Sequence, residues 1–572
     1  MKKELFFSII AAAVSLSGVA QSTITSLDGL SNSKAVAISR ISGKTTATIG
    51  SDGSSLTQSS TASEWAIYNY RGEYFLYNLA NKKFATASAT LSTASPVSVL
   101  PFYIPEHEAW LLDCGGSLLG FDSEAKSFLF TADVLGTEGM FFTMQSGRTI
   151  TDAEQAEIEA AVKPAYEEKL ATYTTFVTNA ENMAKDGLTN YAGAYDVDAL
   201  KEALATPDNY TLPELEALYQ AALLSRYPKS GHYYRIANRT RPSSGVKINY
   251  LSVTRDQSTL SVRKLANPKL GIAADGYAEN LCLFQFEPVG STPDQVKVKA
   301  CATETYFGTG SAGNSIGMAV ENQATTYTLD PTGDFSRFFR FKDNSRSWWL
   351  TCSGGYTLVP YANDESSNNW YFEEVTEIPY IIPASDGFLL LNLPCGVTLP
   401  DGVHAYVAKA ELYNNRIFFV ELDSRDIPAN TPVLIESEQG SASLRFPVAV
   451  DVAPLKESNI LRGTNVYLES VDAYHTLAHQ GTDGKLENLS MVTGTDATMQ
   501  PNNAYMADES LYSKTGDFAI VSTDDGTRAN LNEITIDDAS AEYYDLQGRR
   551  VVDAHRGIVV DGKSRSVILL KK

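Results

Sequence analysis

Aromatic, strand-like segments recur three times in each of two separate regions of this 572-residue sequence. Residues that favour turns, mainly Gly, Ser, Asn and Asp, separate the segments, which is typical of an all-β domain. Each segment is predicted to end one β repeat. The rings that mark these ends are Trp65, Trp110 and Phe142 in residues 22–148, and Phe286, Phe341 and Phe372 in residues 231–376. A repeat this small cannot bury its apolar face alone. The pattern therefore predicts two domains, each built from three β repeats around a pseudo-threefold axis.

The segment SSNNWYFEEV at 366–375 raises the question of whether such rings bind a ligand or fill a core. Burying an aromatic side chain removes about 150–250 Å² from water, and truncating a core Trp to Ala costs roughly 3–5 kcal/mol. A ring that recurs about once per repeat is explained most simply as shared core. We therefore predict that Trp65, Trp110 and Trp370 are core aromatics rather than site residues, and that any ligand binds in the loops beside them.

A helical period replaces the β pattern between the two regions. Apolar residues at steps of three and four predict one face of a long helix; they are Ile158, Val162, Tyr166, Leu170, Tyr173, Val177, Ala180 and Ala184. Thr151 and Glu154 form a capping-box pattern at its start, and Pro164 predicts either a kink or a fresh helix start. Two shorter helices are expected at 197–204 and 212–224. Together they predict a three-helix spacer, with a partner-binding helical module as the alternative.

The β pattern returns after residue 378 and continues to the end of the chain. Strand-like segments such as FLLLNLP and RIFFVEL are separated by turns, and Asn414-Asn415 fits a hairpin turn. IPANTPV at 427–433 is echoed by MQPNNAYM at 499–506, which predicts two similar corners in one β-sandwich. Three short strands are expected in the tail.

The first 20 residues have the parts of a secretory signal peptide: Lys2 and Lys3, an apolar run from Leu5 to about Val14, and small residues before a cut ahead of Gln21. Export through the inner membrane is therefore expected. No later segment is apolar over the length that a transmembrane helix needs. The formal charge of −22 disfavours nucleic acid as a partner, because its phosphates would be repelled.

The five cysteines are scattered, with no CxxC spacing and an odd total. Cys282 lies in the same segment as Cys301 and Cys352, so it could form one disulfide with either of them. A chain of this length does not depend on disulfides for stability. The sequence leaves the pairing open.

No catalytic or cofactor motif is complete in this sequence. His475 and His479 have HxxxH spacing, but Thr replaces the Glu that a zinc peptidase needs. GTGSAG at 308–313 matches GxGxxG without a following helix to bind a phosphate. Adjacent acids such as Glu373 and Glu374 point to opposite faces of a strand and cannot flank one glycosidic bond. We assign no catalytic residue, no metal site and no cofactor, while a calcium ion in an acidic loop stays open.

The three-repeat regions resemble β-trefoil domains of the ricin-B lectin type, whose repeats typically close on Gln-x-Trp. The corresponding triplets are Ser63-Glu64-Trp65, Glu108-Ala109-Trp110 and Asn368-Asn369-Trp370, so the Trp is kept in half of the six repeats and the Gln in none. LYNLANKKF at 76–84 and YYRIANR at 233–239 look like the opening strand and turn of such repeats. The resemblance implies carbohydrate binding and makes Asn78 and Asn238 candidate ligand-binding residues. Alternatively, their amides satisfy backbone groups within a turn.

The last third resembles modules found near the C-terminus of secreted, surface-exposed proteins of anaerobic gut and oral Gram-negative bacteria. The resemblance is carried by phrases that include IPANTPVLI, NILRGT, NNAYM and YYDLQGRRVV. The final module is similar to type IX secretion sorting domains, although GIVVDGKSRSVILLKK lacks the Tyr that usually follows the Gly-hydrophobic pair. This implies a secreted or outer-surface location, and leaves open whether the tail is a cleaved sorting signal or a cap on the sandwich.

These observations predict a mainly β, multi-domain protein. Its expected parts are a signal peptide (1–20), a β-trefoil-like domain (21–148), a helical spacer (149–228), a second β-trefoil-like domain (229–377), a β-sandwich (378–536) and a C-terminal β module (537–572). The expected function is non-catalytic, lectin-like binding of a glycan or glycoprotein. Two alternatives stay open: a carbohydrate-active or peptidase-type hydrolase with an unrecognised active site, and a surface adhesin or scaffold that binds protein. The sequence does not indicate an oligomeric state.

Overall fold

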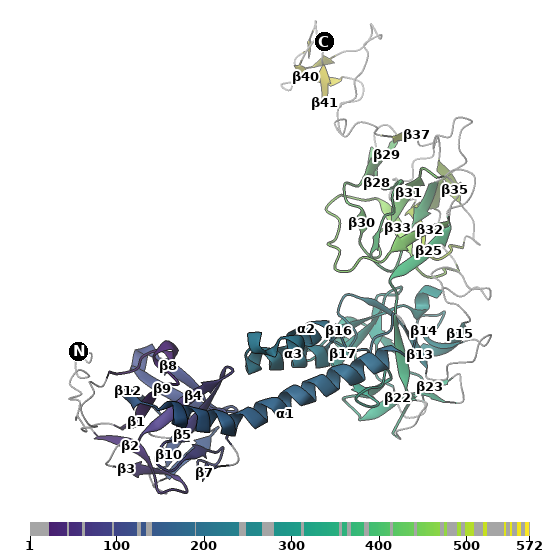
Figure 1. Cartoon of the computed structure of the whole chain (residues 1–572). Helices are drawn as coiled ribbons and strands as arrows, with labels where there is room; N and C mark the ends of the chain where they lie inside the picture. The colour runs from purple at the N-terminus through teal and green to yellow at the C-terminus, as the bar shows by residue number, and fades with distance from the viewer. Residues whose placement is uncertain are drawn as a thin grey trace. The chain divides into compact units, whose positions relative to one another are not determined.

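The structure is a computed structural model, and it shows a mainly β, multi-domain protein with three α-helices among the described residues (Figure 1). The described residues are 22–42, 45–59, 63–93, 96–122, 127–132, 140–188, 190–238, 248–265, 279–310, 314–353, 357–362, 368–381, 388–411, 416–439, 443–469, 474–477, 489–492, 498–507, 519–522, 543–544, 550–551, 557–561 and 567–570. The chain divides into two compact units, Met1–Lys185 with Tyr195–Leu224, and Asp186–Ala194 with Ser225–Lys572.

The first unit contains a twelve-stranded β-trefoil. Its strands are β1 (Lys34–Ser42), β2 (Thr45–Ser51), β3 (Leu56–Ser59), β4 (Trp65–Tyr70), β5 (Glu73–Asn78), β6 (Lys83–Ala85), β7 (Leu91–Ser92), β8 (Leu100–Ile104), β9 (Ala109–Cys114), β10 (Ser117–Asp122), β11 (Ser127–Thr131) and β12 (Phe142–Thr149). Six strands close a ring in the order β1, β4, β5, β8, β9, β12, with a bridge from Phe75 to Ser98 joining β5 to β8. The other six form the hairpins β2–β3, β6–β7 and β10–β11. This arrangement confirms the predicted trefoil.

The second unit contains a trefoil with the same topology. Its strands are β13 (Tyr233–Asn238), β14 (Ile248–Val253), β15 (Leu260–Leu265), β16 (Phe284–Pro288), β17 (Gln295–Ala300), β18 (Thr305–Phe307), β19 (Met318–Ala319), β20 (Tyr327–Pro331), β21 (Phe339–Asp343), β22 (Trp348–Ser353), β23 (Thr357–Tyr361) and β24 (Trp370–Glu374). The ring runs β13, β16, β17, β20, β21, β24 and closes from β24 to β13. The hairpins are β14–β15, β18–β19 and β22–β23.

The aromatic segments do not each close a repeat as predicted. They lie on β4, β9 and β12 in the first trefoil, and on β16, β21 and β24 in the second. The segments of Trp110 and Phe341 therefore belong to the first strand of the third repeat, whereas the others lie on fourth strands. The prediction of three repeats per domain is confirmed, but the predicted repeat ends are wrong at Trp110 and Phe341. The reason is that first and fourth strands both face the barrel core, so both carry large rings.

The three tryptophans of the predicted core are fully buried, at 0% exposure each. Each indole N–H donates to a backbone carbonyl, which satisfies a polar group that would otherwise be buried without a partner. The donor and acceptor residues are Trp65 and Ile49 (2.9 Å), Trp110 and Ile24 (2.7 Å), and Trp370 and Leu350 (3.0 Å). Trp65 and Trp370 start equivalent strands and bond to equivalent second strands, which shows that the two trefoils share their internal geometry.

The three predicted helices are present as α1 (Asp152–Ala184), α2 (Asp198–Ala205) and α3 (Leu212–Leu224). α1 continues through Pro164, so a fresh helix start at that residue is excluded. Its N-terminal part packs Ile158 and Val162 against the first trefoil. Its C-terminal part packs against α2 and α3 around a core that includes Tyr173 and Leu215. The burial of apolar residues on both sides of Pro164 explains why the helix tolerates the loss of one N–H donor.

Arg148 joins the start of α1 to the first trefoil. Its Nε lies 2.7 Å from a carboxylate oxygen of Glu64, and its Nη2 lies 2.8 Å from one of Glu154. Thr151 and Glu154 form the predicted capping box, with Thr151 N donating to Glu154 Oε2 at 2.9 Å and Glu154 N donating to Thr151 Oγ1 at 3.2 Å. Arg148 and, after it, the Thr151 hydrogen bonds lower the pKa of Glu154 to about 2.

We expect Glu154→Gln to destabilise the first unit by roughly 1 kcal/mol at pH 7, because Gln can keep the capping box but loses the charge that pairs with the partly exposed Arg148. A carboxyl group with a lowered folded pKa contributes stability above its unfolded pKa, and that contribution is lost as the pH falls toward about 2. Urea unfolding of both proteins at pH 7 and pH 3 should therefore show a smaller difference at pH 3. An equal difference at both pH values would contradict a role for the charge.

The predicted sandwich follows the second trefoil and is built on a nine-stranded sheet. Its strands are β26 (Phe388–Leu391), β28 (Val403–Glu411), β29 (Arg416–Glu421), β31 (Val433–Ser437), β33 (Leu461–Thr464), β34 (Tyr474–Leu477), β35 (Leu489–Val492), β36 (Asn503–Ala507) and β37 (Ala519–Ser522). Two small sheets accompany it, β25 (Glu377–Ile381) with β32 (Ser443–Pro447) and β27 (Val397–Thr398) with β30 (Asp426–Ile427). Phe446 from β32 and Val397 from β27 share one buried core with Val407 from β28 and Val433 from β31.

The two echoed segments form similar corners, as predicted. Asn430 and Asn502 both adopt left-handed backbone, with φ of 56° and 61°, a conformation that Asn tolerates better than most residues. They precede β31 and β36, and these two strands pair with β26 on its two sides. The repeated phrase therefore corresponds to two equivalent entries into one sheet.

The second trefoil and the sandwich share buried contacts. Tyr233, Leu283 and Cys301 from the trefoil belong to the same apolar cluster as Leu393 and Val397 from the sandwich. The Asn280 side chain is fully buried and donates to the carbonyl oxygen of Asn465 at 2.9 Å. All five cysteines are free thiols, so the disulfide considered for Cys282 does not form.

Four short strands form a further sheet near the C-terminus: β38 (Tyr543–Tyr544), β39 (Arg550–Val551), β40 (Gly557–Asp561) and β41 (Val567–Leu570). Three were expected, because the segment that holds β38 and β39 was predicted as a single strand. The predicted signal peptide, the Asn414-Asn415 turn and His479 lie outside the described residues. The predicted domain boundaries and the sorting role of the tail stay predictions.

Candidate functional site

The two asparagines predicted as ligand-binding residues are buried, Asn78 at 0% and Asn238 at 2% exposure. Asn78 Oδ1 accepts hydrogen bonds from the backbone N–H of Asn81 at 2.9 Å and from its side chain at 3.0 Å. Asn238 Nδ2 donates to the carbonyl oxygen of Asn369 at 3.3 Å. The Asn78 contacts lie within a turn, as the alternative expects, whereas the Asn238 contact is with Asn369, just before the paired strand β24. A ligand-binding role for the two residues stays a prediction.

Asn78 occupies the last position of the first strand of its repeat, and Asp343 occupies the same position in the third repeat of the second trefoil. In both repeats the N–H four residues later donates to the carbonyl of this residue, Lys82 to Asn78 at 2.9 Å and Ser347 to Asp343 at 2.8 Å. Lys82 and Ser347 both have left-handed backbone, with φ of 53° and 56°. Side-chain oxygens at this position therefore stabilise a turn that several repeats share.

An outward-facing aromatic residue occupies an equivalent position on the second strand of four repeats. The residues are Phe84, Tyr250, Tyr306 and Trp349, identified by their cross-strand partners Tyr77, Ala237, Lys299 and Lys342. Phe84 is 1% exposed beneath Ile158 and Val162 of α1, and Tyr250 is 2% exposed beside Leu188 and Tyr191. Tyr306 is 5% exposed and donates to Glu287 at 2.9 Å. Trp349 differs from these three, because it is only half-buried.

Trp349 belongs to a row of side chains that crosses four strands. Thr328 on β20 pairs with Lys342 on β21, Lys342 pairs with Trp349 on β22, and Trp349 pairs with Tyr361 on β23. Residues directly opposite each other on antiparallel strands share one face of the sheet. Tyr361 is 44% exposed. We call this row, together with the neighbouring cross-strand pair Asp330 and Arg340, the β20–β23 face.

Cationic groups lie over the indole rings at this face. The Arg340 guanidinium lies 4.8 Å from the centroid of the Trp349 ring, and the Lys342 ammonium lies 5.7 Å from it. Arg340 also pairs with the Asp330 carboxylate. On the opposite side of the sheet, the Arg346 guanidinium lies 5.4 Å from the centroid of the Trp348 ring, because adjacent strand residues such as Trp348 and Trp349 point to opposite faces. The face thus offers aromatic surface, a carboxylate, hydroxyl groups and cations within one cross-strand patch.

The sequence contains a signal for this face that our interpretation missed. Trp348 and Trp349 are adjacent on one strand, and adjacent strand residues point to opposite faces. A Trp-Trp pair in one strand of a trefoil therefore places one indole on the outer face of the sheet. The prediction of one core ring per repeat concerns β21 and β24, and it does not include this pair on β22.

Apart from the β20–β23 face, a hollow lies between the second trefoil and the sandwich, within one compact unit. Its volume is about 340 Å³, within the size range of small-molecule sites. The lining includes Lys299 and Glu304, which pair at 3.7 Å, together with Gln285, Asn430 and Asp451. Lys299 is already paired with Glu304, and Asp451 adds a further acid, so this hollow does not offer a free cation to an anionic ligand.

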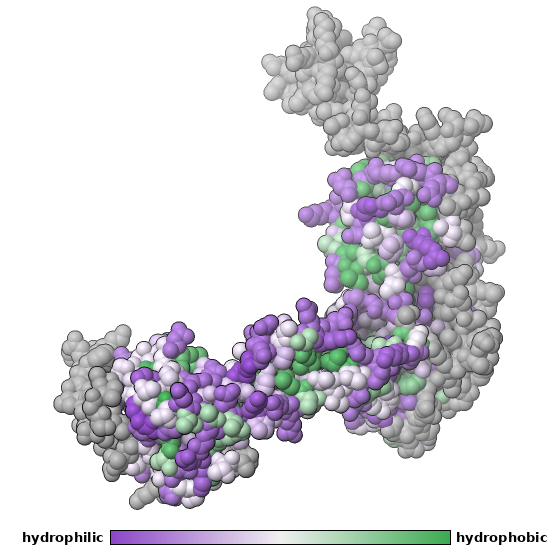
Figure 2. Space-filling model, viewed as in Figure 1, coloured by the Kyte–Doolittle hydropathy of each residue, from purple (hydrophilic) through white to green (hydrophobic). Residues whose placement is uncertain are grey.

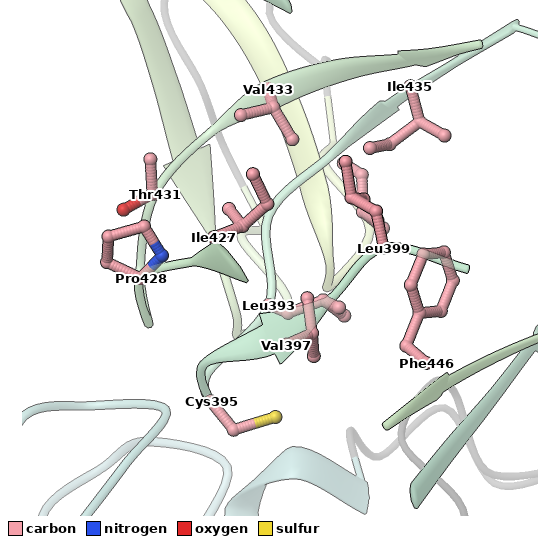
Figure 3. A pocket seen from close by; sticks show the side chains of 11 residues that line it. Leu393, Cys395, Val397, Leu399, Ile427, Pro428, Thr431, Val433, Ile435 and Phe446 are labelled. Carbon is pink, nitrogen blue, oxygen red and sulfur yellow. The ribbon is translucent and has the colours of Figure 1, made fainter. Parts of the chain in front are cut away.

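Another hollow lies inside the sandwich and is not a ligand site. Figure 3 shows its lining, which is almost wholly apolar and includes Leu393, Val397, Ile435 and Phe446. Its volume of about 10 Å³ holds no more than one water molecule. These side chains are therefore packed core. On the molecular face drawn in Figure 2, hydrophilic and intermediate residues cover most of the described surface, with smaller hydrophobic areas between them.

Within the described ranges, no group of three or more His, Cys, Asp or Glu side chains is placed to hold a metal ion. Of the helices in the same part of the chain, none combines the length and the apolar character that crossing a bilayer requires. Burial raises the pKa of the Cys282 thiol to about 11, which keeps it protonated and unreactive as a nucleophile at neutral pH.

Comparison with known proteins gives partial structural matches. No protein-family model and no curated protein matches the sequence. The solved structure described as "BEL beta-trefoil apo crystal form 3" is 18% identical over 26% of this chain and 97% of its own length, with a TM-score of 0.21. "SeviL bound to asialo-GM1 saccharide" is 16% identical over 25% of this chain and 97% of its own length, with a TM-score of 0.19. The chain spans about half of "PSL1a-E64 complex", 49% of its length at 17% identity and a TM-score of 0.20. The trefoil assignment therefore depends on the strand pairing described above.

Proposed function

We propose that this protein is a non-catalytic binding protein that recognises a glycan or glycoprotein through the β20–β23 face of its second trefoil. The observation that carries the proposal is the half-buried Trp349 paired with the exposed Tyr361. In three other repeats the aromatic residue at the position of Trp349 is almost fully buried. An indole and a phenol ring left partly in water offer flat apolar surface to a sugar ring, while Thr328 and Asp330 supply acceptors for hydroxyl groups.

We further propose that the protein acts after export, in secreted form or on the outer cell surface. The support is the signal-peptide pattern of residues 1–20 and the resemblance of the last third to C-terminal modules of surface proteins. Two trefoils in one chain would allow avidity if both bind, because the second contact would then form at a high effective concentration. Asn78 and Asn238 remain the candidate residues beside the predicted loop sites.

Binding to a glycan array tests the proposal. The exported chain is expected to bind at least one glycan class, and Trp349→Ala is expected to weaken that binding roughly tenfold or more, as the loss of a central aromatic contact usually does. Phe335→Ala is the matched control, since Phe335 is also a partly exposed ring of the second trefoil, at 38%, but lies outside the row. Equal binding by wild type and Trp349→Ala would contradict the assigned face.

The array also separates the two alternatives. Turnover of a polysaccharide or peptide without stable glycan binding would favour the hydrolase. A surface adhesin or scaffold is favoured by a different observation: Leu100 and Phe102 on β8 are 44% and 43% exposed, and Leu27 nearby is 44% exposed. Exposed apolar side chains grouped in this way are a common feature of protein contacts. Protein capture that Phe102→Ala abolishes, with no glycan binding, would support that alternative.

A further inference from the structure

The charges of the β20–β23 face differ from the charge of the whole chain. The chain carries a formal charge of −22, yet Arg340, Lys342 and Arg346 gather within seven consecutive residues around Trp348 and Trp349. A local positive field on a strongly acidic protein attracts anions selectively to that place. This patch therefore favours a negatively charged ligand.

Two of the three cations are not neutralised by a described acid. Arg340 pairs with Asp330. Arg346 donates to the backbone carbonyl of Gly310 at 2.8 Å, and among the described residues neither Arg346 nor Lys342 forms an ion pair with a carboxylate. The nearby Asp343 is 4% exposed, and its Oδ1 accepts two hydrogen bonds from Ser345, so it faces inward. Lys342 thus leaves positive charge available to a ligand on the β20–β23 face, and Arg346 adds to the local positive field from the adjoining turn.

The kind of cationic side chain at this face indicates which anionic group the ligand carries. A carboxylate pairs best with the planar fork of an Arg. The Arg340 fork already faces the Asp330 carboxylate, and one Arg346 Nη donates to Gly310. The Lys342 ammonium is a compact point charge, and lysine in this form commonly binds tetrahedral anions such as phosphate. It lies 5.7 Å from the Trp349 centroid, so an anionic substituent on a stacked sugar ring would come within its reach.

We infer that the β20–β23 face binds a sulfated saccharide, with the sugar ring against Trp349 and Tyr361 and a sulfate ester at Lys342. This inference builds on the proposed glycan-binding function and names its ligand class. Binding of the saccharide requires no covalent step and uses the β20–β23 face.

Titration calorimetry of the full mature chain with three probes tests the inference. The probes are a heparin-type sulfated tetrasaccharide, the same saccharide chemically desulfated, and an unsulfated polyuronate fragment of equal length. The sulfated probe is expected to bind at least tenfold more tightly than the other two, and its affinity is expected to fall as salt is raised from 50 to 300 mM. Lys342→Gln is expected to reduce the affinity for the sulfated probe about tenfold, and so to remove most of the difference in affinity between the sulfated and desulfated probes.

Lys297→Gln is the matched control, because Lys297 is a lysine of the same trefoil that donates to the backbone carbonyl of Glu321 and lies outside the face. Equal affinity for sulfated and desulfated probes, both lost in Trp349→Ala, would overturn the sulfate inference and leave glycan binding in place. Preference for the polyuronate would likewise overturn it. Failure of all three probes together with a silent glycan array would overturn the proposed function itself.

Discussion

Replacing Trp370 by alanine will destabilise the second trefoil by about 3–5 kcal/mol. The indole is fully buried among Phe339, Phe372 and Leu350 in one core cluster, and its N–H donates to the Leu350 carbonyl at 3.0 Å. Truncation therefore opens a cavity and leaves that carbonyl without its side-chain donor. Differential scanning calorimetry of the mature chain should show the corresponding transition lowered by on the order of 10 °C.

Trp349→Ala supplies the contrast for this experiment, because Trp349 is on the outer face of the same sheet. It should destabilise the protein less than Trp370→Ala does, because the Trp349 ring is only half-buried and its removal opens no cavity in the core. The two variants together separate the core role from the binding role. A Trp370→Ala protein that melted like wild type but no longer bound glycan would show that the core assignment of the aromatic strands is wrong.

Replacing Leu283 by alanine will destabilise the trefoil and the sandwich together, by about 2–5 kcal/mol. Leu283 is 0% exposed and lies in the cluster that joins the second trefoil to the sandwich. Because both domains contribute side chains to that core, losing the leucine removes contacts from each. Calorimetry combined with limited proteolysis should show the sandwich becoming protease-sensitive in the same temperature range as the trefoil.

Leu112→Ala is the control for this second prediction. Leu112 is 1% exposed in the core of the first trefoil, so its loss should lower only the transition of the first unit. A Leu283→Ala protein whose sandwich transition stays unchanged would mean that the two domains unfold independently in spite of their common core.

The helical region could be predicted closely from the sequence. The i, i+3, i+4 pattern and the Thr151–Glu154 capping box are local features, and local backbone hydrogen bonds decide where a helix starts. The structure accordingly begins α1 at Asp152 and ends α3 at Leu224. Only the continuity of α1 through Pro164 depended on burial against the first trefoil and the other helices.

The repeats could be predicted in number but not in position. Large rings on both the first and the fourth strands serve the same core, so a ring alone does not tell which strand carries it. Trp110 and Phe341 were assigned to closing strands for this reason. Strand pairing across the barrel, such as Trp110 with Phe142, resolves the assignment, and pairing between distant segments is not visible in a single sequence.

By itself, the sequence determined that this chain forms two three-repeat β domains with helices between them and a sandwich after them, because apolar periodicity and turn residues act locally. Only the tertiary structure decided which outward aromatic stays open to a ligand. Phe84 and Tyr250 are covered by segments that lie apart from them in the chain, whereas Trp349 remains half-buried beside Lys342 and Tyr361. Exposure depends on what packs against a residue from elsewhere in the chain, and residue type does not encode it.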